Sequence, residues 1–79
     1  MDNEFSVYHY GFEDVQVAEK RFVSADEAMR TVAALIRSPA AQIGVMKRII
    51  VTDGGDFTNF EWKYGEGITF PPELVGKEV

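Results

Sequence analysis

The sequence contains no cysteine, only one histidine and only three prolines among its 79 residues. Without cysteine the chain forms neither disulfide bonds nor thiolate metal sites, so a reducing compartment is permitted. Its apolar runs, such as residues 49–51, are only a few residues long, far short of the roughly 20 that a membrane-spanning helix needs. Residues 1–4 are acidic and lack the basic and apolar regions of a secretory signal. We therefore expect a cytoplasmic protein without a membrane segment.

Clustered positive charge is also missing. The chain has 13 acidic and 8 basic residues, a net charge of −5, and its basic residues form only the pairs Lys20-Arg21 and Lys47-Arg48. Proteins that bind duplex nucleic acid usually carry a basic patch that displaces counterions from the phosphates. The charge therefore argues against direct nucleic-acid binding. An acidic surface suits a partner protein with a basic surface, and it also serves solubility.

The remaining composition is that of one small globular domain. Hydrophobic residues make up 46% of the chain and charged residues 27%, which are ordinary values. We expect a single domain over residues 1–79, with residues 72–79 as a loosely held C-terminal tail. A domain of this size buries roughly 60% of the surface of its unfolded chain. That is enough for one core but not for a deep, enclosed substrate chamber.

The hydrophobic pattern predicts the order β-β-α-β-β. Strands are predicted at residues 5–12, 15–23, 45–53 and 57–64, with a short fifth strand at 68–70 left open. The helix begins with a capping box, in which the Ser24 hydroxyl accepts a hydrogen bond from the amide of Glu27 and the Glu27 carboxylate reaches back to the amide of Ser24. It ends before Pro39, because the residue that precedes a proline avoids helical angles. Residues 38–44 fit either a short second helix or an ordered loop.

These elements predict an α+β fold with an antiparallel four-stranded sheet and one helix packed on one face. The segment 45–53 is apolar on both sides, which is typical of a central strand. The segment 15–23 contains three consecutive charged residues, which are typical of an edge strand. The sequence leaves the order of the strands open, and with it the choice of aromatic side chains that face solvent.

No catalytic, cofactor-binding or metal-binding pattern is present, and we expect a non-enzyme without cofactor or metal. His9 would need a nucleophile and an orienting acid to act in catalysis, and we expect it to be a half-exposed strand residue. Asp53 and Asp56 flank two glycines. Two carboxylates provide too few oxygens for a calcium loop, whereas aspartate and glycine are the residues that a hairpin turn requires.

The predicted strands carry more aromatic side chains than one helix can cover. We expect Phe60 and Trp62 to lie mainly in the core and Tyr8 or Tyr10 to lie mainly on the surface. An open sheet face that bears aromatic rings is often a binding surface. Stacking of RNA bases on such rings is a further interpretation, but the negative charge of the chain opposes it.

These features predict a non-enzymatic protein-binding module that acts by occupying the surface of a partner protein or complex. The candidate contact residues are Tyr8, Tyr10, Glu13, Asp14, Asp53, Asp56, Glu61, Tyr64 and Glu66. In size, acidity and absence of motifs the chain looks like the small inhibitors that phages and mobile elements encode, including anti-CRISPR proteins. That likeness implies that the acidic residues compete for a basic nucleic-acid channel. The alternatives are a structural homo-oligomer, such as a homodimer, whose open sheets pack or pair their edges, and a small enzyme that uses His9.

Overall fold

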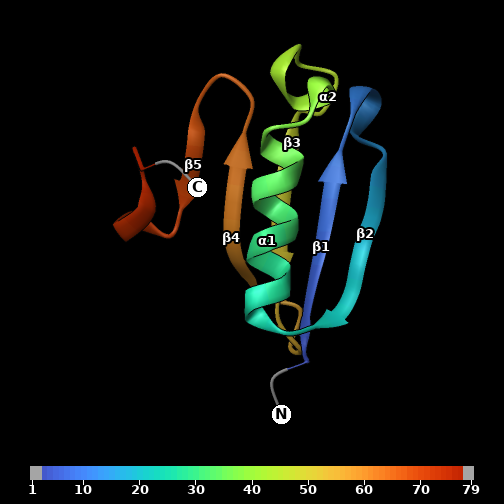
Figure 1. The fold of residues 1–79 in the computed structure, drawn as a ribbon, viewed down its shortest axis with the longest axis vertical. Coiled ribbons are helices and arrows are strands. Elements are labelled where there is room, and N and C mark those ends of the chain that lie inside the picture. Colours follow the sequence, from blue (N-terminus) through green and yellow to red (C-terminus); the bar gives the residue numbers. More distant parts are fainter. Residues whose placement is uncertain (1–2, 78–79) are drawn as a thin grey trace.

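A computed structural model describes residues 3–77 of the chain (Figure 1). The elements are β1 (Phe5–Tyr10), η1 (Phe12–Asp14), β2 (Gln16–Val23), α1 (Ala25–Ile36), α2 (Pro39–Gln42), β3 (Arg48–Thr52), β4 (Thr58–Lys63), β5 (Gly67–Phe70) and η2 (Pro72–Leu74). The predicted α+β class is confirmed, the short fifth strand is present, and residues 38–44 include a short helix.

The five strands form one antiparallel sheet in the order β2-β1-β3-β4-β5. The strand predicted at 45–53 is indeed central, and the one predicted at 15–23 is indeed at an edge. The central strand is shorter than predicted, because the amide of Met46 donates to the carbonyl of Ala40 at 3.0 Å. That bond ties the chain before β3 to α2 and keeps it out of the sheet.

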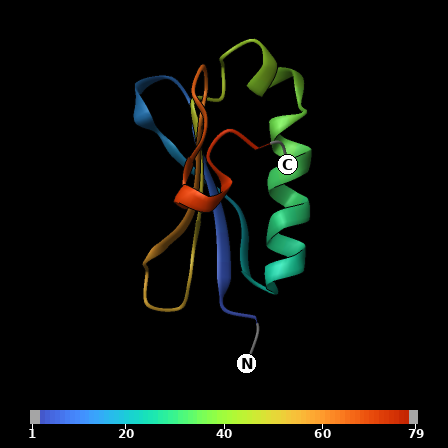
Figure 2. The same cartoon turned by 90° about the vertical axis from the view of Figure 1, so that its left-hand side faces the viewer.

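The main helix covers one face of the sheet only, and Figure 2 shows the opposite face without a helix. The backbone amide of Glu27 donates to the Ser24 hydroxyl at 3.1 Å, which confirms this half of the predicted capping box, while the Glu27 carboxylate pairs with Lys20. A second serine, Ser38, caps α2 in the same way and is followed by a proline at the first helical position. Local sequence therefore sets where both helices begin.

The core lies between α1 and the helix-facing side of the sheet. It consists of Val7, Ala28, Val32, Ala41, Met46, Ile49, Val51, Phe60, Trp62 and Ile68. Phe60 is 2% exposed and Trp62 9% exposed, which confirms their prediction as core residues. Residues that pair across antiparallel strands point to the same face. Val51 pairs with both Val7 and Phe60, so these three side chains define the buried face of the sheet. Because side chains alternate along a strand, the next residue on each of these strands points to the open face.

Within residues 3–77, no helix has the length and apolar character required to cross a membrane. Of the segment predicted to be a loosely held tail, Pro72–Leu74 forms η2, and Leu74 packs against the core. Residues 78 and 79 of that predicted tail lie outside the described residues.

Candidate partner-binding surface

The nine candidate contact residues lie in three separate places. Tyr8, Tyr10 and Glu61 are on the open face of the sheet; Glu13, Asp14, Tyr64 and Glu66 are at the end that carries α2; Asp53 and Asp56 are at the opposite end. The strands β1 and β4 run in the same direction because both are antiparallel to β3. Their C-terminal ends therefore meet at one end of the sheet, and the β3–β4 turn lies at the other (Figure 1).

The β3–β4 turn uses its own aspartate as a structural group. One carboxylate oxygen of Asp53 accepts hydrogen bonds from the amides of Gly55 at 2.9 Å and Phe57 at 3.1 Å. A hydrogen bond from Asn59, together with those from the backbone amides, lowers the pKa of Asp53 from its ordinary value. One oxygen of this carboxylate is thus engaged within the turn. Among residues 3–77, no three acidic or histidine side chains are placed to hold a metal ion.

The open face combines tyrosine rings with cationic side chains. In one row across the strands, Tyr10 pairs with Arg48, and Arg48 pairs with Lys63. The Arg48 guanidinium carbon lies 5.0 Å from the centroid of the Tyr10 ring, and that of Arg21 lies 5.6 Å from the Tyr8 ring. These distances fall within the range of cation–π attraction. Each of the two tyrosines that were predicted as contact residues on this face, Tyr8 and Tyr10, thus has an arginine over its ring.

Glu61 is the acid at the centre of this face, and it is already paired. Its carboxylate forms an ion pair with Arg48 and accepts a hydrogen bond from the Thr69 hydroxyl, and its side chain is 16% exposed. Burial by itself would raise the pKa of Glu61. The hydrogen bonds from Thr69 and Arg48, with the positive charges of Arg48 and Lys63, outweigh burial and lower that pKa. Glu61 therefore holds the strands together on this face.

At the end that carries α2, three loops bring exposed apolar side chains together. We define the rim surface as Phe12, Glu13, Asp14, Val15, Ile43, Val45, Tyr64 and Glu66, which belong to the β1–β2 connection around η1, the α2–β3 loop and the β4–β5 turn. The most exposed are Ile43 at 71% and Phe12 at 61%, and Tyr64 is 45% exposed. Five of the ten large hydrophobic residues that are exposed in the described chain belong to this surface.

Backbone hydrogen bonds and close packing hold the three loops in place. Lys47 donates its amide to the carbonyl of Tyr10 at 2.7 Å and accepts at its own carbonyl from the amide of Tyr64 at 2.9 Å. The Tyr64 ring lies against Gly44, so closely that a Cβ atom on Gly44 would be 2.9 Å from a ring carbon. The ammonium group of Lys47 lies over both the ring of Phe12 and the ring of Tyr64. The exposed side chains thus rest on a fixed backbone.

The rim surface also contains strained backbone. Glu13 and Asp14 have φ values of 65° and 58°, in the left-handed region that non-glycine residues rarely adopt. Such residues cost on the order of 1–3 kcal/mol each and cluster at binding and active sites. Phe22 and Asp56, outside the rim surface, also have positive φ values of 57° and 64°, so the strain by itself does not distinguish this loop.

The apolar part of the rim surface was not predicted from the sequence. Phe12 and Val45 were assigned to strands, whereas both lie in connections, and Val15 and Ile43 were not considered as contacts. A usable signal was present, since each of the three loops combines a glycine with large apolar residues: Gly11, Gly44 and Gly65. An apolar residue next to a turn glycine lies outside the periodic pattern of a strand or helix, so that pattern does not predict it to be in the core.

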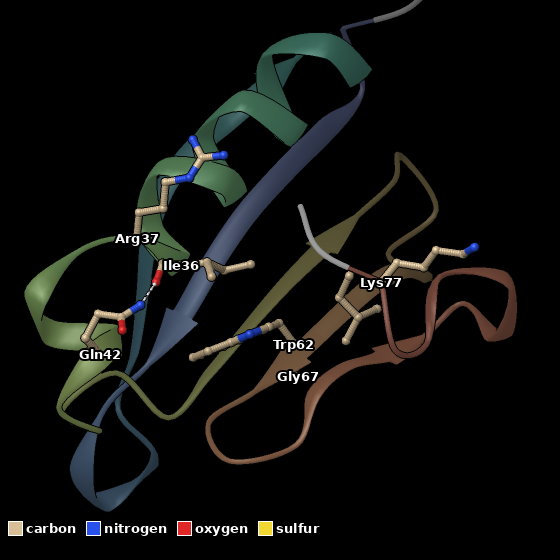
Figure 3. A pocket seen from close by; sticks show the side chains of 7 residues that line it. Ile36, Arg37, Gln42, Trp62, Gly67 and Lys77 are labelled. Atoms are coloured by element: carbon tan, nitrogen blue, oxygen red, sulfur yellow. Dashed lines mark hydrogen bonds between the residues drawn. The ribbon is translucent and has the colours of Figure 1, made fainter.

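The helix-facing side of the molecule contains a cavity of about 370 Å³. It is lined by Ile36, Arg37, Gln42, Trp62, Gly67, Ile68 and Lys77 (Figure 3). The Gln42 side chain donates to the carbonyl of Ile36 at 3.0 Å across one wall. Among the described residues, the lining has no carboxylate, hydroxyl or imidazole group, and the amine of Lys77 is its one group of a kind that acts as a nucleophile or general base.

His9 lies outside that cavity and faces β2. Its Nδ1 atom is 2.8 Å from a carboxylate oxygen of Glu19, and its side chain is 18% exposed. A carboxylate beside an imidazole is one half of a catalytic arrangement, but a nucleophile is also required. Among the hydrogen bonds formed within the described chain, none links a hydroxyl group to His9.

No protein-family model matches this sequence, and neither a curated protein nor a solved structure matches it significantly.

Proposed function

We propose that this chain is a non-enzymatic protein-binding module that acts by occupying a partner's surface, and that the rim surface is its contact site. The observation that carries the proposal is the gathering of exposed apolar side chains on three loops whose backbones are bonded to one another. Exposed apolar side chains gathered in one place often mark interaction sites. Aromatic anchors supply much of the binding energy in such sites, and here Phe12 and Tyr64 are the aromatic members.

The charge of the rim surface supports a partner with a basic surface. Glu13 and Asp14 directly follow one aromatic anchor, and Glu66 lies two residues after the other. All three acidic side chains are exposed. Opposite charges at the border of an apolar contact speed association and set orientation. A protein that handles nucleic acid presents such a basic surface, so an inhibitor of the kind that phages and mobile elements encode fits this proposal.

Affinity capture with variants of the rim surface tests the proposal. The tagged protein is used to capture its partner from native cells, alongside a Phe12→Ser/Tyr64→Ser variant and a Phe57→Ser control. Phe57 is 73% exposed but lies in the opposite turn, next to β4. We expect the double variant to lose a stoichiometric partner that the wild type and the control retain. Equal recovery of that partner with the double variant would refute the rim surface as the contact site.

A structural homo-oligomer is the second candidate. The edge strands of the sheet oppose the form of it in which two copies pair their edges. The edge strand β2 has two register shifts against β1, and Phe22 within it has a φ of 57°. The other edge strand, β5, has four residues and is followed by Pro71. Bulges, short edge strands and proline all oppose the addition of another strand.

Face-to-face packing of two open sheets is opposed by charge. Among the strand residues that the structure describes, the open face carries Arg21, Arg48 and Lys63 against the acid Glu61, so two copies would bring like charges together. The molecular mass of the protein in solution tests this second candidate. A monomer at tens of micromolar excludes the homo-oligomer, and a stable dimer supports it.

A further inference from the structure

The ammonium group of Lys47 lies over two exposed aromatic rings of the rim surface, and we call the space that it occupies the slot. Its ammonium nitrogen lies 4.9 Å from the centroid of the Phe12 ring and 5.5 Å from that of the Tyr64 ring. Both distances are within the roughly 6 Å over which a ring face attracts a cation. One ring comes from η1 and the other from the β4–β5 turn, so the slot is formed by the fold.

The carboxylates of the rim surface have no cationic partner within residues 3–77. The ion pairs of the described residues all lie elsewhere, and none of them includes Glu13, Asp14 or Glu66. Lys47 takes part in none of these ion pairs either. The rim surface therefore combines a pair of rings that binds a cation with carboxylates whose charge is left uncompensated.

Lys47 is held weakly enough to be displaced. An exposed cation–π contact contributes little, and Lys47 is exposed. An arginine is better suited to the slot than a lysine, because its planar guanidinium stacks flat on aromatic rings. It also has N–H groups to spare, which form charge-assisted bonds with carboxylates at the edge of the ring.

We propose that the partner inserts an arginine side chain between Phe12 and Tyr64, and that Lys47 is the resident cation which this arginine displaces. The inference rests on the proposed function, since it names the chemical group that the rim surface recognises. The guanidinium stacks between the two rings, and its outer N–H groups bind the carboxylates of Glu13, Asp14 or Glu66. Lys47 competes for the slot and so lowers the affinity for any single arginine.

An NMR titration with N-acetyl-arginine amide tests the slot directly. The reporters are the ring protons of Phe12 and Tyr64, and the indole N–H of Trp62, which is 9% exposed and belongs to the core, serves as an internal reference. We expect saturable shifts of the two rings alone. Lys47→Ala should bind the amide about two- to fivefold more tightly than the wild type, because one exposed cation–π competitor is removed.

Two controls separate the slot from general effects of charge and of apolar contact. Lys20→Ala removes the same charge from a lysine that pairs with Glu27 away from the rim surface, and it should leave the affinity unchanged. N-acetyl-citrulline amide has the shape of the arginine probe without its charge and should not bind. The proposal would be overturned if Lys47→Ala and Lys20→Ala raised the affinity for the arginine probe equally. It would also be overturned if the citrulline probe bound as tightly as the arginine probe, or if the ring protons showed no saturable shifts. Dimerisation of the Lys47→Ala protein would also overturn it, because an arginine of a second copy would then fill the slot.

The two proposals fail in different ways. If capture depends on the rim surface but the arginine probe does not bind, the arginine slot is wrong and the binding module stands. If the double serine variant retains the partner, the proposed contact site is wrong, whatever the titration shows.

Discussion

Replacing Gly44 with alanine tests how the rim surface is held together. Gly44 has a φ of +84°, and a Cβ atom there would lie 2.9 Å from a carbon of the Tyr64 ring. Two costs therefore add. A left-handed alanine costs about 1–2 kcal/mol, and the ring must also move away from its contacts with Gly44 and Lys47. Loss of the exposed cation–π contact adds about 0.5–1 kcal/mol, so we expect a total of about 1.5–3 kcal/mol.

Gly65→Ala is the matched control for the backbone cost. Gly65 has the same φ of +84°, but a Cβ atom there would meet nothing within 4 Å. It should cost only the backbone part, about 1–2 kcal/mol. The free energies of unfolding come from urea titrations with unchanged m-values. In thermal unfolding each 1 kcal/mol corresponds to about 4–8 °C for a domain of this size.

A double-mutant cycle isolates the contribution of the ring. In a Tyr64→Ala background the ring is absent, so Gly44→Ala should cost no more than Gly65→Ala does in the wild type. The Gly44→Ala single variant should also shift the ring protons of Phe12, because the Lys47 slot loses one wall. If Gly44→Ala and Gly65→Ala cost the same in the wild type, the reasoning about the packing of Tyr64 is wrong.

Three further substitutions test other parts of the structure by urea unfolding. Glu61→Gln should cost about 1–2 kcal/mol at neutral pH, since it removes charge-assisted bonds that are partly exposed to solvent. Because the pKa of Glu61 is lowered from 4.5, its contribution is complete above that value and is lost as the pH falls through the lower folded-state pKa; an equal loss of stability on acidification in the Gln variant would contradict this. Ser24→Ala should cost about 1 kcal/mol through loss of the helix cap, and a neutral effect would mean that the cap contributes nothing. Ile49→Ala, in the fully buried centre of β3, should cost about 2–5 kcal/mol, whereas a cost below 1 kcal/mol would indicate that the core collapses around the gap.

The local parts of the fold were predictable because their causes are a few residues apart. Ser24 and Glu27 lie three residues apart and define the start of α1. Asp53 bonds to amides two and four residues further along and forms its turn. The central place of β3 followed from a segment that is apolar on both sides, which is typical of a central strand; Ile50, on the open face, is 5% exposed.

The candidate site was predictable only in part, because its members meet through strand order and loop packing. Glu13, Asp14, Tyr64 and Glu66 were predicted to be contact residues, but nothing in the sequence placed them at the same end. Glu61 was identified with them, although the register of β3 and β4 sets it beside Arg48. A cross-strand partner depends on register, which a short sequence window does not define.

The sequence was sufficient for the class of fold, the single main helix with its cap, the central and edge strands and the negative net charge, because composition and short-range periodicity set all of these. The tertiary structure alone brought Phe12, Lys47 and Tyr64 together and separated the cations of the open face from the acids of the rim surface. Those groupings join residues from loops that are distant in the chain. Their proximity is set by the parallel course of β1 and β4 on either side of β3, which is a property of the assembled sheet.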